Sequence, residues 1–460
     1  MSNPSPDVEA GPPHSDNEVA AEFTAPASRR SKLALATRAL RHRNFQLFFS
    51  GQLISLIGTW MQTVAQSWLV YRLTGSALLL GTVGFAGQIP VFVAAPIGGI
   101  VADRHNRQRV VIATQTASMI LAAILAALTL SGRVQVWHIM LLAAGLGVVN
   151  SFDIPARQAF LIDMVGREDL LNAIALNSSM FNGARIIGPA IAGILVASIG
   201  EGWCFFANAV SYIAVIIGLM MMRITNPANL AGEGSPMEHI IEGFRFARNN
   251  RPIKGILTLL GVMSFVGMPY AVLMPVFADQ ILHGGARGLG ILMGATGVGA
   301  LLGAATLAAR VGVKGLGRVI GICAGGFGVS LILFSFSKMF WLSTLLLVPV
   351  GFTMMVQMAS SNTLIQSMTP DHLRGRVMAV YTMMFLGMAP FGALFAGAAA
   401  NRIGAPWTVA AGGLACIASA AVFALYLPAI RKEARELILA QGVVGGAPAE
   451  ELTSRGLSSN

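Results

Sequence analysis

The feature that most constrains this chain is a series of long apolar runs that recurs along most of its 460 residues. Each run has about 20 residues, which is the length an α-helix needs to cross a hydrocarbon core of about 30 Å. Backbone N–H and C=O groups meet no water in that core, so each run must be helical. Only 11% of the residues are charged, against roughly 25% in soluble domains. The chain is therefore predicted to be an all-α integral membrane protein.

Twelve such runs can be marked, which predicts twelve transmembrane helices. They cover residues 45–70, 77–101, 110–131, 136–157, 172–198, 203–222, 253–278, 289–309, 318–337, 341–363, 375–400 and 406–427. The fourth run is the least regular, because polar Asn150 and Asp153 interrupt its end.

The basic residues predict which side of the membrane each loop occupies. If the termini and the even-numbered loops share one side, that side holds 25 of the 31 Lys and Arg residues. The other loops hold Arg72, Arg133, Arg287, Lys338 and Arg402, which leaves Arg185 inside a predicted span. The positive-inside rule then places both termini in the cytoplasm. The net charge of +11 is explained by anionic membrane lipids, and no nucleic-acid partner is expected.

An internal repeat predicts two halves of six helices. Nine glycines each meet another glycine 204 residues later, namely Gly51, Gly81, Gly84, Gly99, Gly147, Gly183, Gly188, Gly193 and Gly200. We therefore expect one six-helix bundle over residues 41–222 and a second over 253–430. The intervening cytoplasmic linker, 223–252, is expected to hold an interfacial helix with Met237, Ile240, Ile241 and Phe244 on one face. Residues 1–40 are expected to be a disordered cytoplasmic tail, and 431–460 a second cytoplasmic tail.

The first predicted span carries a polar stripe. Gln52, Ser55, Thr59, Gln62 and Gln66 follow spacings of three and four residues, so they share one helical face. Such a face either lines a central substrate cavity or forms hydrogen bonds to neighbouring helices. The fifth span carries a similar stripe that includes Asn182 and Arg185, and the two stripes are expected to face each other.

Arg185 is the most unusual of these residues, because a charge inside the membrane costs at least about 2.5 kcal/mol. In the first half, no acid lies at a matching depth to pair with it. One interpretation is a structural strut that donates hydrogen bonds to Asn182, Gln62 or backbone carbonyls. The other is that the guanidinium faces the cavity and binds an anionic group of the substrate.

Motifs for other kinds of chemistry do not occur. No G-x-x-x-x-G-K-[ST] loop is present, since Lys254 and Lys314 are each followed by glycine. The seven histidines form no H-E-x-x-H spacing, so neither a metal, a cofactor nor an enzymatic activity is expected. Gly294, Gly297, Gly299 and Gly303 imitate a nucleotide-binding spacing, but they lie within a span, which favours helix packing.

Two short motifs carry a resemblance to a known family. Gly99, Asp103, Arg104 and Arg107, with Arg109 after them, match G-x-x-x-D-R-x-x-R between the second and third spans, which resembles the signature of the major facilitator superfamily. Gly188, Pro189 and Gly193 are similar to the G-P-x-x-G-G element of its exporters, with Ala192 in place of one glycine. The longer stretches NFQLFFSGQLISLIGTWMQTVAQSWLVY, FDIPARQAFLIDMV and NAIALNSSMFNGARIIGPAIAG resemble the enterobactin-exporter-like group, also called transmembrane secretion effectors.

The first motif also has a physical interpretation as a gate. Asp103 at a cytoplasmic helix end can pair with Arg104 or Arg107, and Asp153 is the further acid expected in that cluster. The resemblance implies that this motif locks the outward-open state. The alternative is a set of basic anchors at the membrane surface, which leaves Asp103 unexplained.

The resemblance implies a monomeric transporter of the bacterial inner membrane, in which the two halves rock about a cavity at the midplane. It implies efflux of a small molecule, siderophore-like or drug-like, in exchange for protons or another coupling ion. An importer or uniporter of the same superfamily, or a non-transporting receptor or scaffold, is the alternative. Neither the substrate nor the proton-carrying residue is evident from the sequence.

Overall fold

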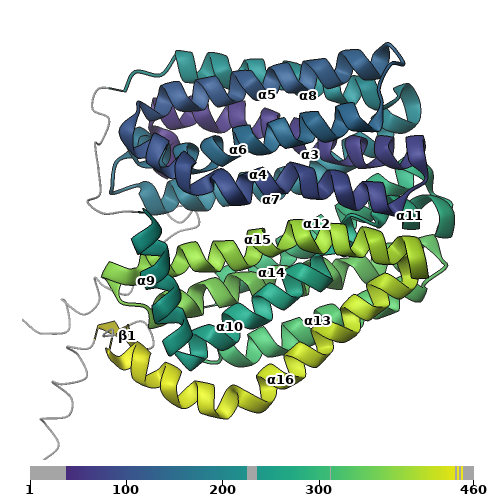
Figure 1. Cartoon of the computed structure of the whole chain (residues 1–460). Helices are drawn as coiled ribbons and strands as arrows, with labels where there is room; N and C mark the ends of the chain where they lie inside the picture. The colour runs from purple at the N-terminus through teal and green to yellow at the C-terminus, as the bar shows by residue number, and fades with distance from the viewer. Residues whose placement is uncertain (1–37, 225–235, 311, 441–442, 445–446, 449–460) are drawn as a thin grey trace, which may run out of the picture.

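Figure 1 shows the computed structural model of the chain, which describes residues 38–224, 236–310, 312–440, 443–444 and 447–448. Residues 1–37 of the predicted first tail and most of the predicted second tail lie outside the described residues. The described part of the chain is almost entirely helical, with one two-residue strand pairing between β1 (Val443–Val444) and β2 (Ala447–Pro448).

The first half is a bundle of six long helices. They are α3 (Arg43–Thr74), α4 (Ala77–Arg104), α5 (Arg107–Leu130), α6 (Val136–Val165), α7 (Leu170–Ile199) and α8 (Glu201–Met220), preceded by η1 (Arg38–Arg41). Local signals set some of their ends. α5 begins after Asn106, whose side-chain oxygen accepts a hydrogen bond from the Arg109 N–H at 3.1 Å. α3 ends at Gly75, which has a φ of 60°.

The second half repeats this plan after the linker helix α9 (Pro236–Asn249). Its first span is broken into α10 (Arg251–Val262), η2 (Met263–Gly267), η3 (Met268–Ala271), α11 (Met274–Val276) and η4 (Phe277–Ile281). The remaining spans are α12 (Gly285–Ala308), α13 (Leu316–Phe336), α14 (Phe340–Met368), α15 (Asp371–Ile403) and α16 (Ala405–Ala440). Pro269 and Pro275 lack the N–H that a regular helix needs, which accounts for breaks in the seventh span.

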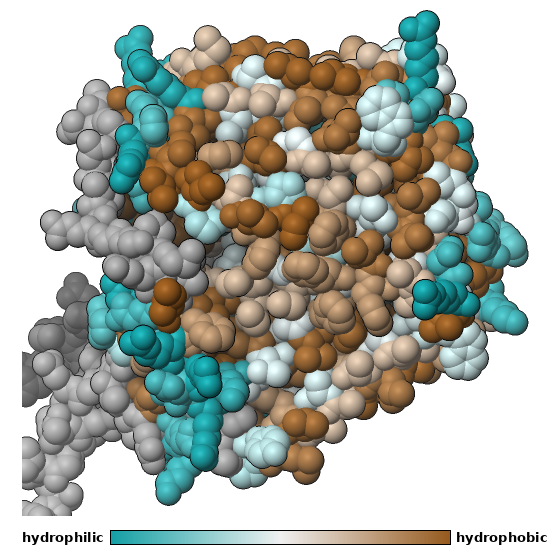
Figure 2. Space-filling view, viewed as in Figure 1, coloured by the Kyte–Doolittle hydropathy of each residue, from teal (hydrophilic) through white to brown (hydrophobic). Residues whose placement is uncertain are grey.

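The twelve-span prediction is confirmed. Among the described residues, eleven helices are long and apolar enough to cross a membrane, with Arg251–Ile281 counted as one. α3 is the twelfth span, and its polar stripe lowers its hydropathy. Figure 2 shows the consequence at the surface, where hydrophilic residues gather at the two ends and the face between them is largely hydrophobic.

One end of the bundle holds α9 and the last helical turns of α16, and we refer to it as the linker end (Figure 1). The linker contains the helix α9 where an interfacial helix was predicted, and the side chains of Met237 and Ile240 on its predicted apolar face lie outside the described residues. Gly243 and Ala247 of α9 are buried, and Glu242 forms an ion pair with Arg376 of α15. Ile241 and Phe244 are each 51% exposed, so the apolar side of α9 is available to a membrane surface.

The fourth span is longer than predicted. The predicted span ended at residue 157, with Asn150 and Asp153 interrupting its end, but α6 continues to Val165. The Asp153 carboxylate accepts hydrogen bonds from Thr114 at 2.8 Å and Gln115 at 2.9 Å, both on α5. A buried carboxylate with several partners does not have to end a helix.

The two halves pack their own helices in the same way and meet along two helix pairs. α4 packs on α6 as α12 packs on α14, while α4 on α15 and α7 on α12 join the halves. Glycines at these crossings let backbones approach: a Cβ at Gly299 would lie 1.9 Å from a backbone oxygen of α14. The mid-span glycines of α12 thus serve helix packing, as their place in the sequence predicted.

We predict that Gly98→Ala destabilises the first half. A Cβ at Gly98 would lie 1.9 Å from the Ser151 carbonyl oxygen of α6, so the two helices must separate. Overpacking of this kind costs about 1–3 kcal/mol, which corresponds to a fall of about 5 °C in unfolding temperature. Gly99→Ala is the matched control, because a Cβ at Gly99 has no atom within 4 Å. Equal unfolding temperatures for the two variants in detergent would contradict this packing.

Candidate functional site

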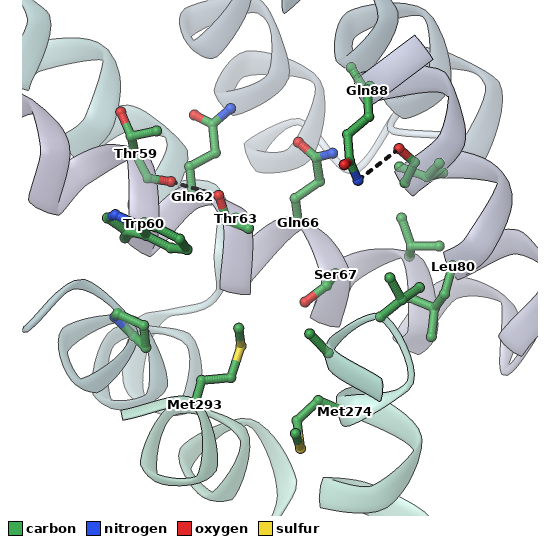
Figure 3. Close-up of a pocket in the computed structure, with 18 of the residues that line it drawn as sticks. Thr59, Trp60, Gln62, Thr63, Gln66, Ser67, Leu80, Gln88, Met274 and Met293 are labelled. Carbon is green, nitrogen blue, oxygen red and sulfur yellow. Dashed lines mark hydrogen bonds between the residues drawn. The ribbon is translucent and has the colours of Figure 1, made fainter. Parts of the chain in front are cut away.

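A cavity of about 420 Å³ lies between the two halves. α3, α4, α6, α7 and α8 form one side of its wall, and the broken seventh span and α12 form the other. The polar residues of the wall are Thr59, Gln62, Thr63, Gln66, Ser67, Gln88, Asn150, Arg185, Asn208, Tyr212, Tyr270 and Thr296. Figure 3 shows Met293 of α12 extending toward Trp60 and Thr63 of α3. The volume is within the range of small-molecule sites.

The polar stripe of α3 reaches the central cavity over only part of its length. The residues of the stripe that line the cavity are Thr59, Gln62 and Gln66. Gln52 and Ser55 are buried outside this wall, with exposed fractions of 2% and 1%. α3 and α8 are in close contact at this level, since a Cβ at Gly51 would lie 3.0 Å from the α8 backbone. The linker-end half of the stripe therefore serves helix packing.

α8 contributes two cavity residues that the sequence reasoning missed. The Asn208 amide donates a hydrogen bond to the Gln62 side-chain oxygen at 2.7 Å. The Tyr212 hydroxyl lies 3.5 Å from the Thr59 hydroxyl. These contacts hold the α3 side chains at the cavity wall. The signal that would have found them is the cluster of polar residues at 208, 211 and 212 in an otherwise apolar span.

Arg185 lies halfway along α7 and is part of the cavity wall. The carbon at the centre of its guanidinium is 5.6 Å from the centre of the Trp60 ring, an arrangement that allows a cation–π interaction. Within the described part of the chain, Arg185 forms neither an ion pair nor a side-chain hydrogen bond. Tyr270 and Thr296 line the same cavity from the other half. The predicted strut contacts to Asn182 and Gln62 are therefore not made, and donor capacity remains for a ligand.

The other residues predicted on α7 have different surroundings. Asn182 donates to the Ser178 carbonyl of its own helix at 2.8 Å and is not part of the cavity wall. Gly188 allows contact with α3, because a Cβ there would lie 2.5 Å from the Trp60 Cβ. Gly193 similarly lies against α12, and Pro189 lines the cavity. Gly188 and Gly193 thus bring α7 close to its neighbours, and a role of this element in export stays a prediction.

The spacing between the halves differs at the two ends of the bundle. At the end opposite α9, a Cβ at Gly81 of α4 would lie 2.4 Å from the α15 backbone, and one at Gly290 of α12 would lie 2.5 Å from the α7 backbone. At the linker end, a Cβ at Gly99 of α4 or Gly375 of α15 would have no atom within 4 Å. The halves therefore pack closely at the opposite end, whereas there is open space beside these two glycines at the linker end.

The residues of the G-x-x-x-D-R-x-x-R motif lie at the linker end, but their ion pairs differ from those expected. Arg107 is buried and binds the Asp163 carboxylate of α6 at 3.1 Å. Asp103 and Arg104 are exposed at the end of α4 and form no ion pair with the described residues. The expected pairing of Asp103 with Arg104 or Arg107 is therefore wrong for this state. Arg107 lies at the start of α5, beyond the turn after α4, and its side chain is directed to α6.

Asp153 belongs to a separate network. Its carboxylate binds Arg157 at 3.2 Å, one helical turn further along α6, in addition to Thr114 and Gln115 of α5. This arrangement is not the expected cluster with Arg107. Both networks connect α5 with α6, so the two carboxylates fasten these helices together within the first half. Arg109 is exposed at the start of α5.

Comparison with known families decides the class of protein. The profile of a family described as "Transmembrane secretion effector" matches residues 34–441, which include the cavity and the motif. The chain belongs to this family. Transmembrane secretion effectors are membrane transporters of the major facilitator type and not enzymes. The resemblance seen in the sequence is confirmed.

Three curated relatives of this transmembrane secretion effector span most of its length. The Staphyloferrin A transporter of Staphylococcus aureus is 27% identical over 382 residues, covering 82% of this chain and 94% of the relative. The Multidrug efflux pump Tap of Mycolicibacterium fortuitum is 28% identical, with coverages of 82% and 93%. The Enterobactin exporter EntS of Shigella boydii is 25% identical, with coverages of 74% and 81%.

A solved structure agrees with the fold. A bacterial homologue of the iron transporter ferroportin, in an inward-facing state, superposes with a TM-score of 0.64 at 15% sequence identity. The match covers 84% of this chain and 98% of that protein. The two-bundle architecture of a major facilitator transporter is thereby confirmed.

We predict that Asp103→Asn slows transport several-fold without lowering stability. In the state described here Asp103 is exposed and has no ion-pair partner among the described residues. Removing its charge therefore breaks no ion pair in this state. Its expected contribution is to the state in which the linker end closes. Transport in proteoliposomes and unfolding temperature in detergent measure the two effects. Glu168→Gln, an exposed acid at the same end, is the control. Normal transport by Asp103→Asn would contradict the gating role.

Proposed function

We propose that this transmembrane secretion effector exports a small amphipathic organic anion by alternating access. The observation that carries the proposal is Arg185, a guanidinium in the cavity wall with no carboxylate partner among the described residues. An arginine at the midplane is costly unless water or a ligand reaches it. A carboxylate or catecholate on the cargo supplies the missing partner. Its two oxygens can accept hydrogen bonds from two N–H groups of the planar guanidinium at once.

The rest of the cavity favours a cargo that also has apolar parts. Met274 and Met293 line it from the second half, and Trp60 lies against Arg185. Methionine side chains are flexible and polarisable, so they adapt to varied ligand shapes. Amides and hydroxyls of α3 and α8 provide hydrogen bonds. The names of the relatives point to the same chemistry, since two are a siderophore transporter and a siderophore exporter, and the third is a multidrug efflux pump.

The sidedness follows from the loop charges. We infer that the linker end faces the cytoplasm, because the predicted internal loops hold most of the basic residues. In this proposal the open space beside Gly99 and Gly375 lies on the cytoplasmic side, where an exporter receives its cargo. We place the protein in the bacterial inner membrane, on the basis of the family and its relatives.

The coupling ion that we propose is the proton. No Asp or Glu occurs among the residues that line the cavity in the described part of the chain, so the proton does not compete with cargo for an acid in the wall itself. Asp153 is buried within the first half, next to Thr114 and Arg157, and is the acid whose replacement by asparagine tests this coupling first.

Transport by purified protein in proteoliposomes tests the proposal. Staphyloferrin A and enterobactin are the first anionic compounds to offer, with a neutral hydrophobic drug for comparison. With the linker end facing outward and the lumen acidic, we expect the anionic compound to accumulate inside the proteoliposomes. This accumulation should collapse when a protonophore dissipates the pH gradient. Equal flux in both directions, unaffected by the gradient, would favour a uniporter, and flux driven only the other way would favour an importer. Absence of flux for every compound would leave a receptor or scaffold as the better interpretation.

A further inference from the structure

A second cavity lies away from the central one, in a groove between α10 and α16 at the linker end. It has a volume of about 700 Å³ and shares no lining residue with the central cavity. We call it the α10–α16 groove. The residues that line it are Arg251, Lys254, Gly255, Thr258, Leu259, Ser419, Val422, Phe423 and Tyr426. Figure 1 shows α10 and α16 side by side on the outer surface of the second half, next to α9.

The groove is basic at the linker end and uncharged further in, where apolar side chains lie among the hydroxyls of Thr258 and Ser419. Arg251 and Lys254 lie in the first turn of α10, and Leu259 lies eight residues further along, which is about 12 Å of helix. On α16, Val422 and Phe423 continue the apolar part, with Tyr426 nearer the linker end. The half-thickness of a hydrocarbon core is about 15 Å. The change from basic to apolar therefore follows the change from headgroup to acyl chain within one leaflet.

The charge of the groove is positive and only partly balanced. Arg251 lies 3.5 Å from Glu433 of α16, but its side chain is 80% exposed, which leaves donors available. Lys254 is exposed and has no ion-pair partner in the described part of the chain. Arg248, in the last turn of α9, adds a third positive charge close by. Thr258, Ser419 and Tyr426 add hydroxyl groups along the wall.

We propose that the α10–α16 groove binds one anionic phospholipid of the leaflet at the linker end. Arg251 and Lys254 hold the phosphate, and the acyl chains lie against Leu259, Val422 and Phe423. A lipid is favoured over a free phosphate, because a phosphate alone would leave the apolar side chains of the inner wall without a partner. A zwitterionic lipid would bring its own amine next to two cations, which is unfavourable. This proposal is independent of the cargo of the central cavity.

Native mass spectrometry of the full chain, titrated with phosphatidylglycerol or with phosphatidylethanolamine of the same acyl chains, tests the proposal. We expect one tightly held phosphatidylglycerol and weaker retention of phosphatidylethanolamine. In the double variant Arg251→Gln/Lys254→Gln the apparent affinity for phosphatidylglycerol should fall about 30-fold, since each basic residue near an anionic headgroup contributes about 1 kcal/mol. Glycerol 1-phosphate at millimolar concentration should not displace the lipid.

Two further variants make the test specific. Lys314→Gln/Arg318→Gln removes two exposed basic residues at the linker end of the same half, outside the groove, and should retain phosphatidylglycerol as the native chain does. Ser419→Phe keeps every charge but fills the groove, and should lose the lipid at an unchanged elution volume. Equal losses in the two double variants, or full retention in Ser419→Phe, would overturn the proposal and indicate a general attraction of lipid to the basic end. Displacement by glycerol 1-phosphate would indicate a site for free phosphate.

Discussion

Replacing Arg185 with alanine is expected to lower transport of anionic cargo about 100-fold, and transport of neutral cargo far less. Hydrogen bonds to charged groups contribute about 1.5–3 kcal/mol, and 2.8 kcal/mol corresponds to roughly a factor of 100. Since Arg185 has no carboxylate partner among the described residues, its removal does not leave a protein carboxylate unpaired. Initial rates for staphyloferrin A and for a neutral drug in the same proteoliposomes measure this difference.

Two other variants on α7 distinguish binding from a structural role. Arg185→Lys keeps the positive charge but loses the planar guanidinium fork, so we expect a loss of about tenfold, mainly as a higher KM. Asn182→Ala is the matched control, since Asn182 bonds only to its own helix in the described contacts and lies outside the cavity wall. If Arg185→Ala reduced both kinds of cargo equally and also lowered the unfolding temperature, Arg185 would be a structural strut.

Breaking the ion pair between Arg107 and Asp163 is expected to cause the largest loss of stability. The exposed fractions of these two side chains are 6% and 2%, and their charged atoms are 3.1 Å apart. Arg107→Ala leaves the Asp163 carboxylate buried without its partner, which costs about 3–5 kcal/mol. For a bundle of this size we expect the unfolding temperature in detergent to fall by about 10 °C.

The double variant Arg107→Leu/Asp163→Leu separates this effect from the loss of side-chain packing. Apolar replacement of both partners removes the unpaired charge, so much of the lost stability should return. Arg104→Ala, which removes an exposed arginine of the same motif, should leave the unfolding temperature unchanged. A double variant no more stable than Arg107→Ala, or an equal fall in Arg104→Ala, would contradict the assignment of Asp163 as the partner.

Much of the architecture was predictable because the membrane limits the choices. Apolar runs of about 20 residues must be helices, and their number, order and basic loops need no tertiary information. The same reasoning isolated Arg185, since any charge within such a run is exceptional. Predicted ends were less accurate where polar residues occur. α6 runs to Val165 and its Asp153 accepts hydrogen bonds from α5. The sequence of the fourth span alone does not indicate these partners.

The tertiary structure alone decided which neighbour each polar face meets. Helical spacing placed Gln52 to Gln66 on one face of α3. Only the packing of the helices around α3 shows that Gln52 and Ser55 are covered, whereas Thr59, Gln62 and Gln66 reach the cavity. The acids near the motif posed the same problem, because the sequence predicted Asp103 as the partner of Arg107 and Asp153 as the further acid, whereas the partner is Asp163. Arg107 and Asp163 are 56 residues apart in the chain, so their pairing depends on how α5 crosses α6. Sequence periodicity determines the direction of a side chain about its own helix axis, whereas an ion pair or a cavity wall depends on the distance between helices, which side-chain packing sets.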